Sequence, residues 1–431
     1  MTLNSLFHRV LALALAGTAI ACSGCSTILT VREQQRRADQ IAVISGTVTT
    51  DHEPRGPLIV GILAQGKSGP FLLDHFVTEK PGPWIFAVEP GTYWLAAFED
   101  IDGDGRYNED PALRPDPNQP IALATGQRLE GVELRIPLQG RFTRDKFTLS
   151  DFQYRDTADQ HRVSVFALSV AGEVTTLADS RFSREVAAKG MWQFYDFLLD
   201  TRPGIYFLEA YDPKKIPVLF VHGIAGTPLE FAPLIDRLDR TRFQPWVFYY
   251  PSGARLESLA ALLTQLFVRL RVQYGFDRAA VVAHSMGGLV TRGFLLQDHE
   301  THAADVVRTY VTISSPLGGM ASAGKGVEMS PIVVRSWYGL APGSEYLDGL
   351  FYEDPAGKTK RRRLPKSMSY HLLFGFRGSG PNDGVVALSS QLRQEAQEEA
   401  RTERGFDETH TSILQSAAVA DYLNEVLAAP R

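Results

Sequence analysis

The residues best suited to nucleophilic chemistry lie around Ser285. An apolar run over residues 279–283, typical of a buried strand, leads into this serine, and a segment of helical composition follows it. A serine between a strand and a helix can lie on a tight turn that exposes its hydroxyl, provided that the residues two before and two after it are small. Ala283 and Gly287 stand at these positions, although glycine is commoner at the first. The pattern therefore predicts a nucleophile elbow.

A serine hydroxyl becomes a strong nucleophile when a nearby histidine takes its proton. His299 and His302 lie in a polar run, where a histidine is usually solvated, and His371 stands at the start of a predicted strand. His410 occupies a predicted loop before a final amphipathic segment and is the favoured base. His284 adjoins the serine, but neighbouring side chains on a sharp turn diverge. We therefore expect His284 to pack or hydrogen-bond beside the site.

The histidine in turn needs a carboxylate that fixes its tautomer. Asp383 is the favoured acid, because it follows a strand-like run over residues 372–376 through a glycine-rich turn. Three other carboxylates, interpreted as surface groups, are alternatives: Asp348, Asp354 and Asp407.

A glycine-rich loop also follows an early predicted strand over residues 218–221. It begins with His222 and Gly223 and continues with Ile224. Glycine lets the main chain turn its amides inward, which suits a loop that binds the negative charge of a reacting carbonyl oxygen. A simple connection without chemistry is the alternative interpretation.

Four motifs together resemble the lipase-like α/β-hydrolases. The resemblance spans residues 205–428, about half of the chain, and the motifs are His222-Gly223, the serine turn, Asn382-Asp383-Gly384 and Thr409-His410.

The resemblance implies a chain order of serine, acid and histidine. Ser285 would be the nucleophile, Asp383 the acid and His410 the base, and the backbone amides of Ile224 and Met286 would form the oxyanion hole. The implied activity is hydrolysis of a carboxylic ester of a small molecule or a lipid, with no cofactor required for catalysis. An amidase, thioesterase or acyltransferase would use the same residues. A surface-binding protein without catalytic activity is a further alternative.

The remaining composition is consistent with this fold class. From Ile205 onward, strand-like runs alternate with longer amphipathic segments, which predicts an α/β domain over residues 205–431 with a mostly parallel sheet covered on both faces. Residues 316–370 form a predicted lid or cap insertion. A net charge of -5 from 44 basic and 49 acidic residues gives no indication of nucleic-acid binding.

Residues 41–180 are expected to form a separate small β-sandwich, because short apolar runs are interrupted by Gly and Pro about every ten residues. The segment 89–98 resembles transthyretin-like or carboxypeptidase-regulatory-like modules. A connecting helix over residues 181–204 would join this part to the α/β domain, and residues 25–40 are interpreted as a mobile linker.

An acidic loop within this part has the ligand spacing of a calcium site. Oxygen-bearing side chains alternate at Asp100, Asp102 and Asp104, and Asn108 follows. Pro111 stands where an EF-hand loop has its bidentate glutamate. A structural calcium ion and a solvated acidic loop are both open interpretations.

The N-terminus has the layout of a secretory signal, with a basic start and an apolar run over residues 10–21. The only cysteines, Cys22 and Cys25, follow in a segment that resembles a bacterial lipobox. This resemblance implies removal of residues 1–24 and a lipid on Cys25, with Cys22 as the rival position. The protein would then be anchored to a membrane of the bacterial envelope, the outer membrane being favoured. A plain signal peptide and a secreted or periplasmic protein are the alternative.

Overall fold

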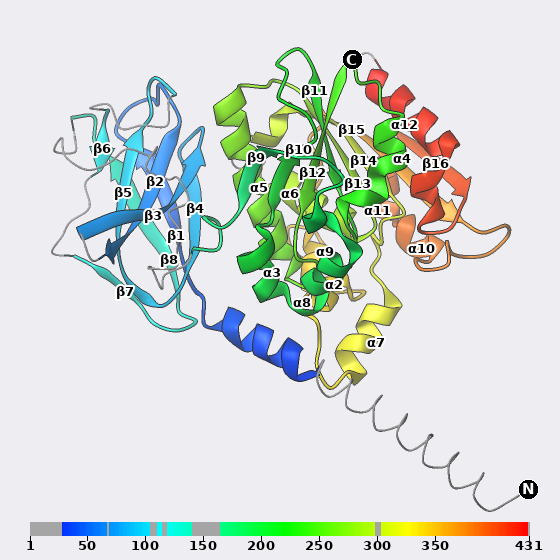
Figure 1. Ribbon diagram of the computed structural model, residues 1–431, viewed down its shortest axis with the longest axis horizontal. Helices are drawn as coiled ribbons and strands as arrows, with labels where there is room; N and C mark the ends of the chain where they lie inside the picture. Colours follow the sequence, from blue (N-terminus) through cyan, green and yellow to red (C-terminus); the bar gives the residue numbers. More distant parts are fainter. Residues whose placement is uncertain are drawn as a thin grey trace, which may run out of the picture.

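The computed structural model describes residues 28–66, 69–103, 110–113, 119–139, 164–297 and 303–429. Figure 1 shows two parts side by side, an N-terminal all-β region and a larger α/β region.

The all-β region consists of two sheets that share one core. Its strands are β1 (Ala42–Thr50), β2 (Leu58–Gly66), β3 (Gly69–Thr78), β4 (Gly82–Val88), β5 (Gly91–Glu99), β6 (Ala112–Leu113), β7 (Ile121–Leu123) and β8 (Arg128–Ile136). One sheet has the order β4-β1-β8 and the other β3-β2-β5-β6, with β7 paired to β5. Buried side chains such as Ile44, Val60 and Trp84 come from both sheets and form the common core. The expected all-β region is confirmed, and the likeness to a particular module stays a prediction.

Within the described residues, the α/β region contains a sheet in the order β16-β15-β14-β13-β11-β12-β10-β9. These strands are β9 (Val170–Val174), β10 (Gly204–Phe207), β11 (Ile216–Val221), β12 (Phe243–Tyr249), β13 (Ala279–His284), β14 (Val307–Ile313), β15 (Ser369–Phe376) and β16 (Thr402–Asp407). Strands β11 to β16 are parallel to one another, whereas β10 pairs with β12 in the antiparallel direction. The predicted α/β fold with a mostly parallel sheet is confirmed.

Helices cover both faces of this sheet. Alternate residues of β11 show the arrangement, because Leu219 belongs to one hydrophobic cluster and Phe220 to the other. The first cluster also contains α5 (Leu256–Tyr274) and α6 (Met286–Gln297), and the second contains α4 (Ala232–Asp236) and α12 (Ala417–Ala428). Strands buried on both faces explain the continuous apolar runs in the sequence.

Shorter helices lie between the strands or after the last strand of this sheet. They are η3 (Ser180–Phe182), α2 (Arg184–Trp192), α3 (Phe194–Thr201), η4 (Pro228–Phe231), η5 (Ala303–Val306), α7 (Ala321–Met329), α8 (Arg335–Leu340), α9 (Glu345–Gly349), α10 (Leu388–Gln391), α11 (Gln394–Gln397) and η6 (Ser412–Gln415). Helices α7, α8 and α9 occupy the insertion between β14 and β15. In the described part of the chain, no helix is both long enough and apolar enough to cross a membrane.

Two boundaries differ from the sequence prediction. Strand β9 pairs with β10 in the α/β sheet, so this sheet begins at Val170, before the expected end of the β-rich part at residue 180. The segment 181–204, expected to be one connecting helix, contains the end of η3, all of α2 and α3, and the start of β10.

The predicted mobile linker over residues 25–40 is wrong for residues 28–39, which form a helix against the α/β region. Gln34 is only 3% exposed, and its Oε1 accepts hydrogen bonds from the backbone N–H groups of Tyr195 (3.0 Å) and Asp196 (2.9 Å) at the start of α3. Arg335 Nη2 donates to the carbonyl of Gln35 from α8. These contacts hold the helix on the protein surface.

The two regions meet where α5 packs on β3. Val268 of α5 lies in one apolar cluster with Ile59 of β2 and Val77 of β3. Beside this cluster, Arg269 Nη2 forms an ion pair with Asp74 at 3.1 Å. We call Asp74, Ser164 and Arg269 the junction cluster.

Candidate active site

The turn between β13 and α6 has the strained geometry of a nucleophile elbow. Ser285 has a φ of 53°, in the left-handed region that non-glycine residues rarely adopt. A Cβ atom added to Gly287 would lie 2.4 Å from the carbonyl oxygen of Val221 and 2.5 Å from that of His222. Only glycine therefore lets α6 begin so close to β11. The close approach of these two elements explains why the sequence pattern requires a small residue two positions after the serine.

The structure brings the three predicted triad residues together at the carboxyl edge of the sheet. His410 Nε2 lies 2.9 Å from Ser285 Oγ, and His410 Nδ1 lies 2.7 Å from Asp383 Oδ2. Asp383 follows β15 and His410 follows β16, so three separate strands position the group. The His410 N–H also donates to the Asp383 carbonyl at 2.9 Å, which ties the two loops together. Serine, imidazole and carboxylate thus form one line of hydrogen bonds.

The surroundings of Asp383 favour its ionised form. This residue is 0% exposed, and burial opposes ionisation. The hydrogen bond and charge of His410, together with the N–H groups of Val386 (2.7 Å) and Val385 (2.9 Å), outweigh burial and lower the pKa of the carboxyl. An aspartate anion is therefore ready to hold the Nδ1–H of His410.

His284 supports the loop that carries His410. Its Nε2 lies 2.8 Å from the carbonyl oxygen of His410, so Nε2–H is the donor. Burial lowers the pKa of His284 to about 3, with a further contribution from the nearby His410. A neutral His284 can act as this donor at every pH above its pKa. Its ring centroid lies 4.7 Å from that of His410, and His410 is the hydrogen-bond partner of Ser285.

The glycine-rich loop after β11 lies directly against the serine. A Cβ atom on Gly223 would be 2.7 Å from Ser285 Cβ and 3.2 Å from its Oγ, so a side chain there would displace the nucleophile. Ala225 has a φ of 51°, and its N–H donates to Ser252 Oγ at 2.9 Å. Ile224, the predicted oxyanion-hole residue, lines the cavity next to this turn.

Met286 is the first residue of α6, where a backbone N–H has no partner inside its own helix. This N–H therefore suits the second oxyanion-hole position.

His222 anchors the start of the glycine-rich loop. It stacks on Tyr250, with ring centroids 4.2 Å apart, and its Nδ1 lies 2.8 Å from the Gly223 carbonyl oxygen. Burial lowers the pKa of His222 to about 4, and the bond to Gly223 opposes this effect. His222 is therefore neutral near pH 7 and has a positioning role.

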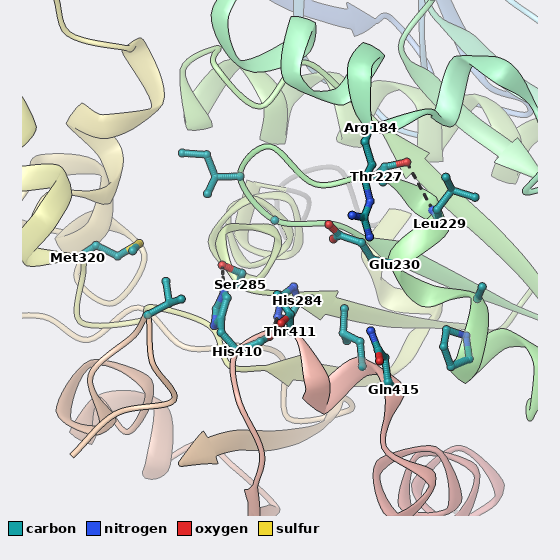
Figure 2. Close-up of a pocket in the computed structure, with 16 residues that line it drawn as sticks. Arg184, Thr227, Leu229, Glu230, His284, Ser285, Met320, His410, Thr411 and Gln415 are labelled. Carbon is teal, nitrogen blue, oxygen red and sulfur yellow. Dashed lines mark hydrogen bonds between the residues drawn. The ribbon is translucent and has the colours of Figure 1, made fainter. Parts of the chain in front are cut away.

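The triad opens into a cavity of about 460 Å³. Ser285, His410, Arg184 and Glu230 are among the side chains that line it (Figure 2). Apolar side chains form much of the remaining surface, namely Ile224, Leu229, Ala232, Pro233, Met320, Val385 and Leu414. The size suits a small organic molecule or part of a larger one.

Other predicted site residues lie elsewhere. His371 Nδ1 lies 2.7 Å from Thr402 Oγ1, on the two adjacent strands β15 and β16. Three alternative acids have other partners: Asp348 pairs with Arg393, Asp354 accepts from the N–H of Gly357, and Asp407 accepts from the N–H of Gly378. His299 and His302 lie outside the described residues.

Only some residues of the predicted lipidation and calcium sites belong to the described part of the chain. Cys22, Cys25, Asp104 and Asn108 lie outside the described residues. Asp100 and Asp102 are described, and within the described ranges no group of three or more His, Cys, Asp or Glu residues could hold a metal ion. Both sites stay predictions.

Sequence reasoning missed Arg184 and Glu230. Arg184 begins α2, about 100 residues before the serine, and only the tertiary structure brings it to the pocket. The sequence contains only a weak indication of a site role for Glu230, namely an acidic residue in the first helical turn after the glycine-rich loop.

Comparisons with known proteins agree with this fold. Residues 218–420 match the sequence model of the alpha/beta hydrolase family. No curated protein matches the chain.

Among solved structures, the chain is similar to the mature Bacillus licheniformis lipase BlEst2, with 16% sequence identity and a TM-score of 0.40. The similar region covers 51% of this chain and 94% of that lipase. It is also similar to Aspergillus fumigatus lipase B, with 16% identity, a TM-score of 0.40, and coverage of 54% and 57%. A Listeria innocua gene product has 16% identity and a TM-score of 0.39, with coverage of 50% and 95%. The match over residues 218–420 and the order of the strands show that this part of the chain has the α/β-hydrolase fold.

Proposed function

We propose that the protein is a serine hydrolase that cleaves carboxylic esters through an acyl-enzyme on Ser285. The observation that carries this proposal is the line of hydrogen bonds from Ser285 through His410 to Asp383. Such a line supplies a nucleophile, a base that takes its proton and an anion that fixes the base.

In the first half of the proposed reaction, Ser285 Oγ attacks the ester carbonyl carbon and its proton passes to His410 Nε2. The carbonyl oxygen becomes an oxyanion, to which the N–H groups of Ile224 and Met286 donate. One such donor contributes about 10²–10³ in turnover in related chemistry. The bond to the alcohol oxygen then breaks, and His410 returns the proton to that oxygen as the alcohol leaves.

In the second half, a water molecule attacks the acyl carbon and gives its proton to His410 Nε2. The bond between the acyl group and Ser285 Oγ breaks, and Oγ regains the proton as the acid leaves. Asp383 stays ionised throughout and stabilises the imidazolium form of His410. The proposed reaction consumes one ester and one water molecule.

A fluorophosphonate probe tests the nucleophile. We expect it to label Ser285 in the native protein and to leave the Ser285→Ala variant unlabelled. Equal labelling of both proteins would contradict the proposal.

A set of 4-nitrophenyl esters of increasing acyl length, with matching amides and thioesters, tests the bond that is cleaved. Turnover of the amides alone would replace the esterase assignment by an amidase.

We also propose that a lipid on Cys25 anchors the protein to the bacterial outer membrane. The support is the sequence Ser23-Gly24-Cys25 after an apolar segment. Mass spectrometry of the mature N-terminus is the test, with Cys25→Ser and Cys22→Ser as matched variants. We expect Cys25→Ser alone to release the protein from membranes. Release by Cys22→Ser alone would move the anchor to Cys22.

A further inference from the structure

Two charged side chains in the wall of the active-site cavity take no part in the proposed ester chemistry. Arg184 comes from the first turn of α2, and Glu230 comes from η4, directly after the glycine-rich loop. Figure 2 shows the Arg184 guanidinium beside the Glu230 carboxyl, with Glu230 on the side nearer Ser285. Any substrate that fills the cavity meets both groups.

The Glu230 carboxyl packs against the glycine-rich loop. Its Oε2 lies 2.9 Å from the position that a Cβ on Gly226 would occupy. Burial raises the pKa of Glu230 to about 7, although the backbone of Thr227 and the charges of Arg184 and His410 oppose this rise. A protonated carboxyl can donate a hydrogen bond, which an ionised one cannot.

Arg184 faces Glu230 without a salt bridge. Within the described part of the chain, its guanidinium makes no hydrogen bond or ion pair, and it affects Glu230 through its charge. The planar guanidinium has five donors in a geometry that matches carboxylates and phosphates. An arginine with unused donors at the edge of a largely apolar cavity is suited to hold an anionic group of a ligand.

We propose that Arg184 and Glu230 form an anion subsite, so that the preferred esters combine an apolar body with one carboxylate or phosphate group. This proposal rests on the proposed esterase function and names its substrate class. Arg184 donates to the anion, and protonated Glu230 adds a second donor. The wall of the cavity then distinguishes an anionic ester from a neutral ester of equal length.

The subsite responds to pH through Glu230. The titratable and charged groups that face Glu230 are Arg184 from α2, His410 from the loop after β16, and Tyr250, which follows β12. When Glu230 ionises, it neutralises the field of Arg184 and repels a bound anion. Preference for anionic esters is therefore strongest below neutral pH and declines as the pH rises through 7.

Pairs of esters that differ in one charge test this subsite. On the acyl side, the 4-nitrophenyl ester of glutarate is compared with that of its neutral monomethyl ester. On the alcohol side, 4-butyryloxybenzoate is compared with its methyl ester. These carboxylates are ionised above about pH 6. The readout is the ratio of kcat/KM for the anionic ester to that for the neutral ester, because effects of His410 on both esters cancel in the ratio.

We expect the ratio to exceed one for wild type at pH 6 in at least one pair, and Arg184→Gln to lower it about tenfold by removing a charge-assisted contact. Glu230→Gln should make the ratio independent of pH between 6 and 8.5. Lys189→Gln is the matched control, because Lys189 lies on the same helix, pairs with Asp200 and is not part of the cavity wall. A ratio unchanged by Arg184→Gln in both pairs would overturn the subsite while leaving the esterase proposal intact.

Calorimetric titration with glutarate at pH 6 separates failure of the subsite from failure of the esterase proposal. If wild type hydrolyses no ester, the esterase proposal is wrong, and glutarate binding then decides about the subsite. We expect Arg184→Gln to weaken binding about tenfold. Equal binding by both proteins would overturn the subsite.

Discussion

Asp383 in the candidate active site and Asp74 in the junction cluster are both buried and both accept several hydrogen bonds. Asp383 is 0% exposed and accepts from His410 and two backbone N–H groups. Asp74 is 1% exposed and accepts from Ser164, from the N–H of His75 and from Arg269. Despite this likeness, the pKa of Asp383 is lowered, and that of Asp74 is raised.

The two pKa values shift in opposite directions because a different effect dominates at each carboxyl. At Asp74 burial is the largest effect and exceeds the opposing charge of Arg269 and the hydrogen bonds. At Asp383 the contributions of His410 and the backbone donors together exceed burial. The carboxyl that is proposed to stay charged during a reaction thus differs from the carboxyl that joins the two regions. The predictions below test this distinction by comparable changes at both places.

The largest expected difference concerns turnover. Asp383→Asn presents an amide to His410 Nδ1 and favours the wrong tautomer, so kcat should fall about 10⁴-fold. Asp74 does not line the cavity, so we expect Asp74→Asn to keep kcat within about twofold of wild type. The measurement is the kcat for 4-nitrophenyl butyrate, with thermal unfolding as a check on folding. A loss below tenfold in Asp383→Asn would contradict the assigned role.

The second prediction concerns stability at the junction. Arg269→Ala leaves the buried Asp74 carboxylate without its cation, which typically costs about 3–5 kcal/mol. Urea unfolding at pH 7 measures this loss, and the exposed Arg278→Ala is the control. The loss should shrink at acid pH, where Asp74 takes a proton. A loss below about 1 kcal/mol would mean that the pair behaves like an exposed one.

The elements with strong local signals were predicted from sequence. The elbow at Ser285 combines an apolar strand, two small neighbours and a helix within about a dozen residues. Asp383 and His410 followed from chain order, and the structure places both beside the serine. The strand-like runs predicted over residues 218–221, 279–283 and 372–376 lie in β11, β13 and β15.

The features missed depend on distant contacts. The helix over residues 28–39 has a polar sequence, and its position depends on Gln34, whose partners lie about 160 residues away. Strand β16 is a polar edge strand in which only Phe406 is buried. Arg184 reaches the cavity from a segment interpreted as a connection. No local pattern reports such contacts.

The third prediction concerns the change in the free energy of unfolding as the pH falls. The pKa of His222 is lowered to about 4 and that of His284 to about 3, both mainly by burial. Between about pH 6.5 and pH 4 the unfolded chain therefore binds protons that the folded pocket does not, so the free energy of unfolding falls as the pH falls. The raised pKa of Asp74 acts in the opposite direction, because protonation favours the folded junction. Acid should weaken the pocket before the junction.

His222→Phe tests the size of this effect and keeps a ring that can stack on Tyr250. One histidine contributes at most about 1.4 kcal/mol per pH unit to the slope of unfolding free energy. We expect the variant to lose about that slope between pH 5 and 6. The slope of the wild-type protein over the same pH range is the reference. An unchanged slope in His222→Phe would mean that His222 is not buried in neutral form.

The smallest expected effect concerns a second ion pair at the junction. Arg271 of α5 and Glu79, the residue after the end of β3, lie 3.1 Å apart, and their side chains are 23% and 25% exposed. Water screens such a pair, so Glu79→Gln should cost less than about 1 kcal/mol in unfolding free energy and less still at high salt. Urea unfolding at low and high salt is the measurement. A loss equal to that of Arg269→Ala would show that position at the junction, and not burial of the carboxylate, determines stability there.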